Sequence, residues 1–181
     1  MALNATIHQF DIDLADADRG VYQSLSLRVA RHPSEAEEFL VARVLAYCLE
    51  WTEGIGFSKG LSTPDEPAIH VRDLTGQMLT WIDVGVPDAG RLHRAAKAAP
   101  RVAVYTHKDP ALLQAALAGA RIHRAEHLAL HAFDRGLIDA LCTRLARRMS
   151  WSVSVSGGHL YVTTGSDTLE GNVVALAPAA S

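Results

Sequence analysis

Three carboxylates, Glu35, Asp65 and Asp83, have the side chains and the order along the chain that could hold a divalent cation. Glu35 follows Pro33-Ser34, Asp65 precedes a short strand, and Asp83 lies near the end of the next strand. A hard cation takes oxygen ligands from several elements, and its bound water can attack phosphorus. With two neighbouring acids added, the sequence predicts a site for Mg²⁺ or Mn²⁺ formed by Glu35, Glu38, Asp65, Glu66 and Asp83.

The order of these acids resembles a metal-dependent nuclease core. A nuclease of that type carries a lysine two residues after the second-strand acid, where it stabilises charge and positions water. Here that position is Gly85. Another cation would have to replace the lysine, and the candidates are Lys59, Arg94, Lys97 and Lys108.

Local patterns predict the elements that would position the acids. Alternating apolar residues indicate a hairpin of strands over residues 6–14 and 22–30. Ser34 and Glu37 have the spacing of a capping box, which predicts a helix from Ser34 to about Trp51 with Glu35 and Glu38 in its first turn. Strands over residues 68–72 and 78–84, joined by a turn at 73–76, would return Asp83 to the end where Asp65 lies.

The rest of the chain alternates between helical and strand patterns. The expected order is a helix over 89–98, a buried strand over 102–105 parallel to a neighbour, a helix from Asp109-Pro110 to Leu117, a strand over 128–133, a helix over 136–148, and strands over 151–155, 160–163 and 173–176. Residues 54–64 read as a loop, and the tail after Pro178 is expected to fray. This predicts an α/β fold with a mixed central sheet flanked by helices and an N-terminal β-hairpin.

Composition limits the class of protein. A chain of 181 residues with 49% hydrophobic side chains fits one domain over residues 1–181 with its own core. No apolar stretch approaches the roughly 20 residues that span a bilayer, and no export signal precedes residue 6, so we expect a cytoplasmic protein that does not contact membranes. Cys48 and Cys142 are expected to be buried free thiols.

The net charge of −3 opposes a global attraction to nucleic acid. Two basic clusters nevertheless stand out: Arg91, Arg94, Lys97 and Arg101, and Arg144, Arg147 and Arg148.

Several uncommon motifs in a fixed order resemble the bacterial YaeQ family. They are residues 1–7 (MALNATI), 30–35 (ARHPSE), Gly60-Leu61, 65–67 (DEP) and 81–87 (WIDVGVP). The resemblance implies a compact α/β fold built on a variation of the PD-(D/E)xK, or restriction-endonuclease-like, core. It assigns Glu35 as the helix acid, Asp65 as the motif aspartate and Asp83 as the acid of the third element. YaeQ-like chains share the departure at Gly85, and no activity is established for the family.

Three interpretations follow for these acids. The first is a metal-dependent nuclease or phosphodiesterase that acts on nucleic acid through Glu35, Asp65 and Asp83. The second is a catalytically silent regulatory module that uses the same scaffold to bind nucleic acid or a protein partner. In the third, Asp65 and Asp83 form structural ion pairs with Arg91, Arg94 or Arg43, because a buried carboxylate needs a compensating partner.

Overall fold

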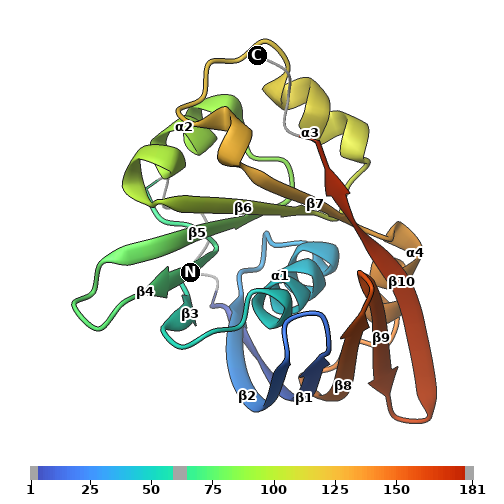
Figure 1. Cartoon of the computed structure of the whole chain (residues 1–181). Coiled ribbons are helices and arrows are strands. Elements are labelled where there is room, and N and C mark those ends of the chain that lie inside the picture. Colours follow the sequence, from blue (N-terminus) through green and yellow to red (C-terminus); the bar gives the residue numbers. More distant parts are fainter. Residues whose placement is uncertain (1–3, 59–64, 178–181) are drawn as a thin grey trace.

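One curved sheet runs through the whole molecule. The structure, a computed structural model, describes residues 4–58 and 65–177. Within them, ten strands form a mixed sheet in the order β2-β1-β8-β9-β10-β7-β6-β5-β4-β3 (Figure 1). The strands are β1 (Thr6–Asp16), β2 (Val21–Arg31), β3 (Ile55–Phe57), β4 (Ile69–Arg72), β5 (Met78–Val84), β6 (Arg101–Thr106), β7 (Ala129–Phe133), β8 (Arg148–Ser156), β9 (His159–Thr164) and β10 (Asp167–Leu176). The helices are α1 (Glu37–Leu49), α2 (Ala89–Ala98), α3 (Pro110–Leu117) and α4 (Arg135–Cys142), with a 3₁₀ turn η1 (Ala125–His127).

The N-terminal hairpin β1–β2 is confirmed. The two strands pair antiparallel from Thr6↔Arg31 to Asp16↔Val21. Phe10, Ile12 and Leu14 are buried on one face, as the alternating pattern predicts. On its other edge β1 runs parallel to β8, which connects the start of the chain to its last third.

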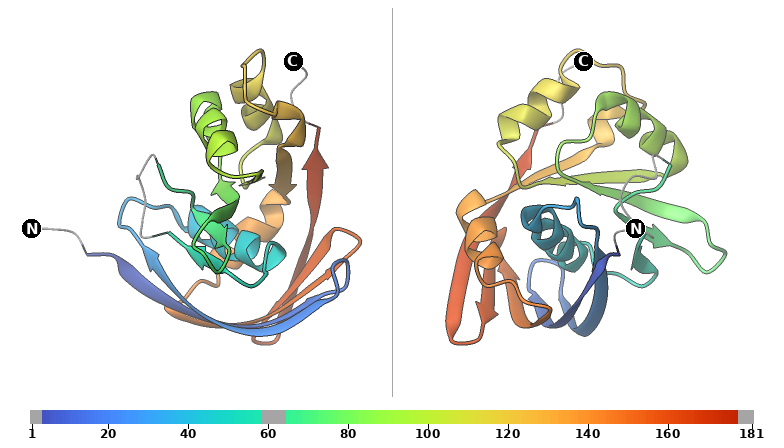
Figure 2. Two further views of the ribbon diagram at one scale, coloured as in Figure 1. Left: turned by 60° about the vertical axis from the view of Figure 1, so that its left-hand side comes forward. Right: turned by 180° about the vertical axis from the view of Figure 1, so that it is seen from behind.

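Helix α1 lies inside the curve of the sheet. The two halves of the sheet bend around it, and α4 lies beside it (Figure 2). Every residue from Leu40 to Cys48 is buried, so this helix is covered on all sides. Cys48 is a buried free thiol as expected, whereas the free Cys142 is only half-buried.

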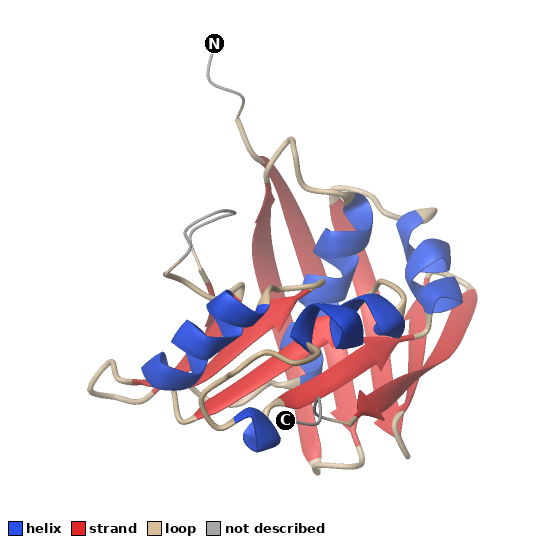
Figure 3. Cartoon of the chain, turned by 90° about the horizontal axis from the view of Figure 1, so that it is seen from above, coloured by secondary structure: helices blue, strands red, loops and turns tan. Residues whose placement is uncertain are grey.

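A second apolar layer covers the opposite face of β5 to β7. Helices α2 and α3 lie together over this face (Figure 3). Leu92 of α2 and Leu113 of α3 pack in one cluster with Trp81, Val102 and Val104. Because β5 and β6 are parallel and bury both faces, their sequences are nearly continuous apolar runs, which is why residues 102–105 were correctly predicted as a buried parallel strand.

The predicted start of α1 is wrong. The helix begins at Glu37, its N-cap is Ala36, and no side chain caps it. The Ser34 hydroxyl is 2.7 Å from Nδ1 of His32 instead of bonding a helix amide. Glu35 therefore lies in the segment before the helix and not in its first turn.

The largest of the other differences from the prediction concern α4, β3 and β10. Helix α4 ends at Cys142, because the chain must enter β8 at Arg148, which lies opposite Gln9 of β1. Residues 55–57 form the edge strand β3 where a loop was expected. Strand β10 begins at Asp167 and includes Gly171, where a Cβ atom would come within 2.7 Å of the Asp134 side chain, so only glycine lets α4 pack this closely.

Part of the prediction falls on residues outside the described ranges, namely residues 1–3 of the first motif, residues 59–64 of the expected loop with Lys59 and Gly60-Leu61, and the tail after Pro178. Within the described ranges, no helix has the length and apolar character needed to cross a membrane.

Candidate functional site

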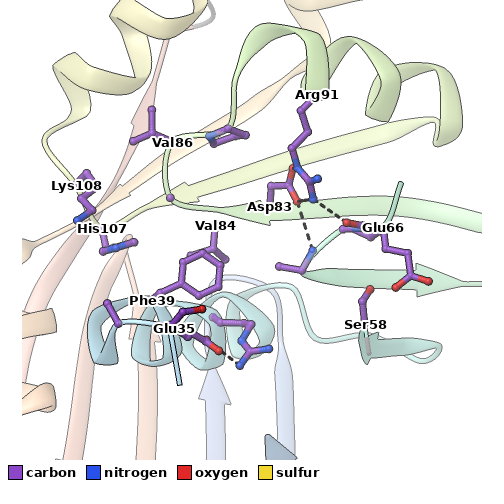
Figure 4. A pocket seen from close by; sticks show the side chains of 17 residues that line it. Glu35, Phe39, Ser58, Glu66, Asp83, Val84, Val86, Arg91, His107 and Lys108 are labelled. Atoms are coloured by element: carbon purple, nitrogen blue, oxygen red, sulfur yellow. Dashed lines mark hydrogen bonds and ion pairs between the residues drawn. The ribbon is translucent and has the colours of Figure 1, made fainter. Parts of the chain in front are cut away.

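A cavity of about 440 Å³ opens between the start of α1 and the carboxyl ends of the parallel strands β5 and β6 (Figure 4). The carboxyl ends of parallel strands are a common place for ligands in α/β proteins. The lining residues are Ser34, Glu35, Ala36, Phe39, Arg43, Ser58, Glu66, Pro67, Ala68, Asp83, Val84, Gly85, Val86, Pro87, Arg91, His107 and Lys108.

Asp83, near the end of β5, is held by Arg91 on the cavity wall. Arg91 Nε is 2.7 Å from Oδ2 of Asp83, and Nη2 is 3.0 Å from Oδ1. Asp88 caps α2 by accepting a hydrogen bond from the Arg91 amide at 2.8 Å, which places Arg91 in the first turn of that helix. Its guanidinium lies 5.3 Å from the centre of the Trp81 ring, and the bond to Asp83 raises the pKa of Arg91. Asp83 thus forms one of the ion pairs that the structural interpretation predicts.

Glu35 is buried beside Arg43 on the opposite wall. Arg43 Nη2 is 2.9 Å from Oε1 of Glu35, although this contact lacks the alignment of a hydrogen bond. The other oxygen accepts a bond from the His32 amide at 3.2 Å. Arg43 also donates to the Ala30 carbonyl at 2.8 Å, so it ties α1 to β2. Burial raises the pKa of Glu35, and the charge of Arg43 opposes that rise.

The structure brings together only part of the predicted acidic set. Glu35, Glu66 and Asp83 line the cavity, whereas Asp65 and Glu38 do not. Asp65 is exposed on the segment before β4. Among residues 4–58 and 65–177 no group of three His, Cys, Asp or Glu side chains is placed to hold a metal ion. The Mg²⁺ or Mn²⁺ site stays a prediction, and two of its acids carry arginine partners.

Of the cations predicted to replace a motif lysine, only Lys108 lines the cavity among the residues that the structure describes. Gly85 lines the cavity with a φ of 95°, a backbone conformation that side chains disfavour. Arg94 and Lys97 are exposed on α2 and are absent from the lining, and Lys59 lies outside the described residues. Lys108 lines the cavity directly after β6.

His107 is the lining residue that the sequence reasoning missed. It is 7% exposed, and its Nδ1 is buried with no hydrogen-bond partner in the described chain. Burial lowers the pKa of His107 to about 4, and the charge of Lys108 adds to this effect, so the ring is neutral near pH 7. The position of His107 in the sequence could have indicated this role. It directly follows the buried run of β6, and ligands commonly bind at the carboxyl ends of parallel strands.

The YaeQ family model matches residues 1–173 of this chain. The chain belongs to the YaeQ family. The uncharacterized protein YaeQ from Salmonella typhi is 30% identical over 175 residues, which cover 94% of each chain. The uncharacterized protein YaeQ from Escherichia coli (strain K12) is 38% identical over 111 residues, and this match spans 61% of the length of either protein.

Solved YaeQ structures have the same fold as this chain. The crystal structure of YaeQ from Pseudomonas syringae superposes with a TM-score of 0.85 and 31% identity, over 95% of this chain and 96% of that one. The YaeQ protein from Xanthomonas axonopodis pv. citri gives a TM-score of 0.81 and 28% identity, over 94% and 97% of the two chains. The family and its overall fold are therefore established here, while the names of these relatives state no activity.

Proposed function

We propose that this YaeQ-family chain is a nucleic-acid-binding module that contacts the phosphate backbone through a basic layer, defined as Arg94, Lys97, Arg121 and Arg124. The observation that carries the proposal is an uneven distribution of charge. Residues 86–128 contain seven Lys and Arg against three Asp and Glu, although the whole chain has a net charge of −3. Clustered Lys and Arg on one face are the usual electrostatic feature of nucleic-acid binders.

The residues of the basic layer lie on adjoining segments. Arg124 Nη2 donates to the Ala96 carbonyl at 2.9 Å, which attaches the segment before η1 to α2. The His123 amide donates to Nδ1 of His93 at 3.0 Å and makes a second link between the same segments. All four basic side chains are exposed, and within residues 4–58 and 65–177 none forms an ion pair with an acid. Arg94, Lys97 and Arg121 can therefore offer their charge to a polyanion, whereas the Arg124 guanidinium also binds the Ala96 and Ala99 carbonyls.

The acidic residues of the neighbouring cavity are already paired with arginines. This pairing supports a mode of nucleic-acid binding that does not need a divalent ion. Asp83 and Glu35 each lie within 3 Å of an arginine nitrogen. A cation bridging these acids would have to break the Asp83–Arg91 and Glu35–Arg43 ion pairs, which costs free energy because Asp83 and Glu35 are buried. We therefore expect affinity for nucleic acid to be the same in EDTA and in Mg²⁺ of matched ionic strength.

Fluorescence anisotropy with labelled single-stranded DNA, single-stranded RNA and duplex DNA, measured over a range of salt concentrations, tests this function. The double variant Arg94→Glu/Lys97→Glu should weaken binding and reduce the slope of log K against log salt by about 2. The matched control Arg28→Glu/Arg72→Glu makes the same change in net charge on exposed residues of β2 and β4, outside both basic clusters. Equal losses in both variants, or in-cell crosslinks that recover only protein, would contradict the proposal.

Metal-dependent phosphodiester cleavage is a second candidate, favoured by the presence of Glu35, Glu66 and Asp83 around one cavity. On this hypothesis the core is a PD-(D/E)xK variant and Lys108 takes the place of the motif lysine. Cleavage of single-stranded, duplex and structured substrates with Mg²⁺ or Mn²⁺ should then disappear in Asp83→Asn and in Lys108→Ala. Trace cleavage that is equal in wild type and both variants would be contamination and would refute this candidate.

A further inference from the structure

His107 is a buried residue of the cavity lining. Its buried Nδ1 has no partner in the described chain, and an unpaired N–H group is rarer in protein interiors than an unpaired acceptor. The proton of the neutral ring is therefore placed on Nε2. The ring lies against Phe39 in an edge-to-face contact with centroids 6.1 Å apart, so its orientation is fixed by packing. In Figure 4 the ring lies between Lys108 and Phe39 on the cavity wall.

The amino end of α1 supplies further donors at the same wall. The N-cap Ala36 has no capping side chain, and Ala36 and Phe39 both line the cavity. In the described chain, no group accepts a hydrogen bond from the amides of Glu37, Glu38 or Phe39. Neither the Glu37 nor the Glu38 side chain is part of the lining. Free amides and the positive end of a 13-residue helix favour an oxyanion there.

The two ends of the cavity differ in charge. The Asp83–Arg91 and Glu35–Arg43 pairs are each neutral, which leaves Lys108 and Glu66 as the unbalanced charges of the lining. His107 and Lys108 lie at one end, whereas Ser58 and Glu66 lie at the other (Figure 4). Phe39 and Val84 lie between these ends in the same view, and Val86 also lines the cavity. The volume of about 440 Å³ suits a small ligand. The lining favours a ligand with an anionic end near Lys108 and a flat apolar middle.

We propose that this cavity binds a nucleotide by its terminal phosphate monoester, with the phosphate between His107, Lys108 and the amino end of α1 and the nucleoside toward Ser58 and Glu66. The phosphate can belong to a free mononucleotide or to the end of a strand. The cavity residues are distinct from the basic layer, so this proposal stands whether or not the chain binds a polyanion.

Isothermal titration with AMP, adenosine and inorganic phosphate tests the site. AMP should bind at least about tenfold more tightly than adenosine, which lacks the phosphate, and Lys108→Ala should raise the Kd for AMP by about tenfold. His107→Phe, which keeps a ring but removes the donor, should have a similar effect. Lys97→Ala removes an exposed lysine outside the cavity and should leave the Kd unchanged. Equal affinity for AMP and adenosine, or equal effects of the two lysine variants, would overturn the proposal.

Two ten-nucleotide strands, one with a 5′-phosphate and one with a 5′-hydroxyl, distinguish the sources of the phosphate. Tighter binding of the phosphorylated strand assigns the site to a strand end, whereas a gain seen only with AMP assigns it to a free nucleotide. The variant Arg94→Glu/Lys97→Glu should weaken binding of both strands and leave AMP binding intact. If that variant weakens AMP binding to the same extent, the nucleotide lies on the basic layer and the cavity assignment is wrong.

Discussion

Arg91 and Asp83 meet in a two-point ion pair, with Nε 2.7 Å from Oδ2 and Nη2 3.0 Å from Oδ1. Asp83 belongs to the end of β5 and Arg91 to the first turn of α2. Arg91 Nη2 also donates to the Glu66 carbonyl at 2.7 Å, on the segment that leads into β4. The pair thus joins three segments of the cavity wall.

Breaking this pair should destabilise the protein. Asp83→Ala removes the carboxylate that the half-buried Arg91 binds at two points, and we expect a loss of about 2–4 kcal/mol in the free energy of unfolding. Arg91→Ala should cost a similar amount because Asp83 is 3% exposed. Urea unfolding followed by circular dichroism measures both losses. In the double variant the combined loss should fall short of the sum by about 1–2 kcal/mol, and simple additivity would argue against coupling.

Several short elements of this fold were predictable because the residues that determine each element are close together in the sequence. The alternation in residues 6–14, the breakers around residues 73–76 and the Asp88 cap of α2 each determine a short segment by itself. The parallel strand β6 was predictable because a strand buried on both faces leaves a continuous apolar run. The predicted α/β class, mixed sheet and N-terminal hairpin follow from these segments.

The candidate site was only partly predictable, because its partners come together through packing. Arg43 reaches Glu35 only because α1 lies inside the curved sheet, and no pattern in the sequence indicates that curvature. The capping-box pattern of Ser34 and Glu37 failed since His32 takes the serine hydroxyl. Glu35 therefore precedes the helix and lies in the cavity wall.

A second buried network should anchor the end of α1. The Tyr105 hydroxyl on β6 donates to Oε1 of Glu50 at 2.7 Å, and Arg101 binds both oxygens of the same carboxylate. Tyr105→Phe removes one hydrogen bond to a charged acceptor in a buried place. It should lower the free energy of unfolding by about 1.5–3 kcal/mol in urea titrations.

Tyr22 offers the matched control for this prediction, since it is 64% exposed and makes no hydrogen bond through its hydroxyl to any described residue. Tyr22→Phe should change stability by less than about 0.5 kcal/mol. A loss in Tyr105→Phe no larger than that in Tyr22→Phe would show that the Glu50 network adds nothing to stability.

Acidification should destabilise the protein through His107. The pKa of His107 is about 4 in the folded chain and 6.5 in the unfolded chain, so the unfolded chain binds more protons between these values. The stabilising effect is complete above pH 6.5 and is lost as the pH falls toward 4. We expect about 1–2 kcal/mol from this residue, because the side of the ring that faces the cavity stays partly solvated.

Urea unfolding at several pH values from 7.5 to 4 checks the effect. The slope of stability against pH should be smaller in His107→Phe than in wild type. The control His127→Phe alters an exposed histidine and should keep the wild-type slope. Parallel curves for wild type and His107→Phe would show that this ring does not cause the acid sensitivity.

Placing a lysine at Gly85 should harm the fold instead of creating a nuclease site. Gly85 has a φ of 95°, and a non-glycine residue held there carries about 1–3 kcal/mol of backbone strain. A Cβ atom would meet His107 and Phe39 only at 3.8 Å, which is ordinary contact, so the cost comes from the backbone and not from a clash. Gly85→Ala and Gly85→Lys should therefore lose similar amounts of stability in urea unfolding. A Lys variant as stable as wild type, or one that gains Mg²⁺-dependent cleavage absent from the Ala variant, would show that the backbone at this position can accept the motif lysine.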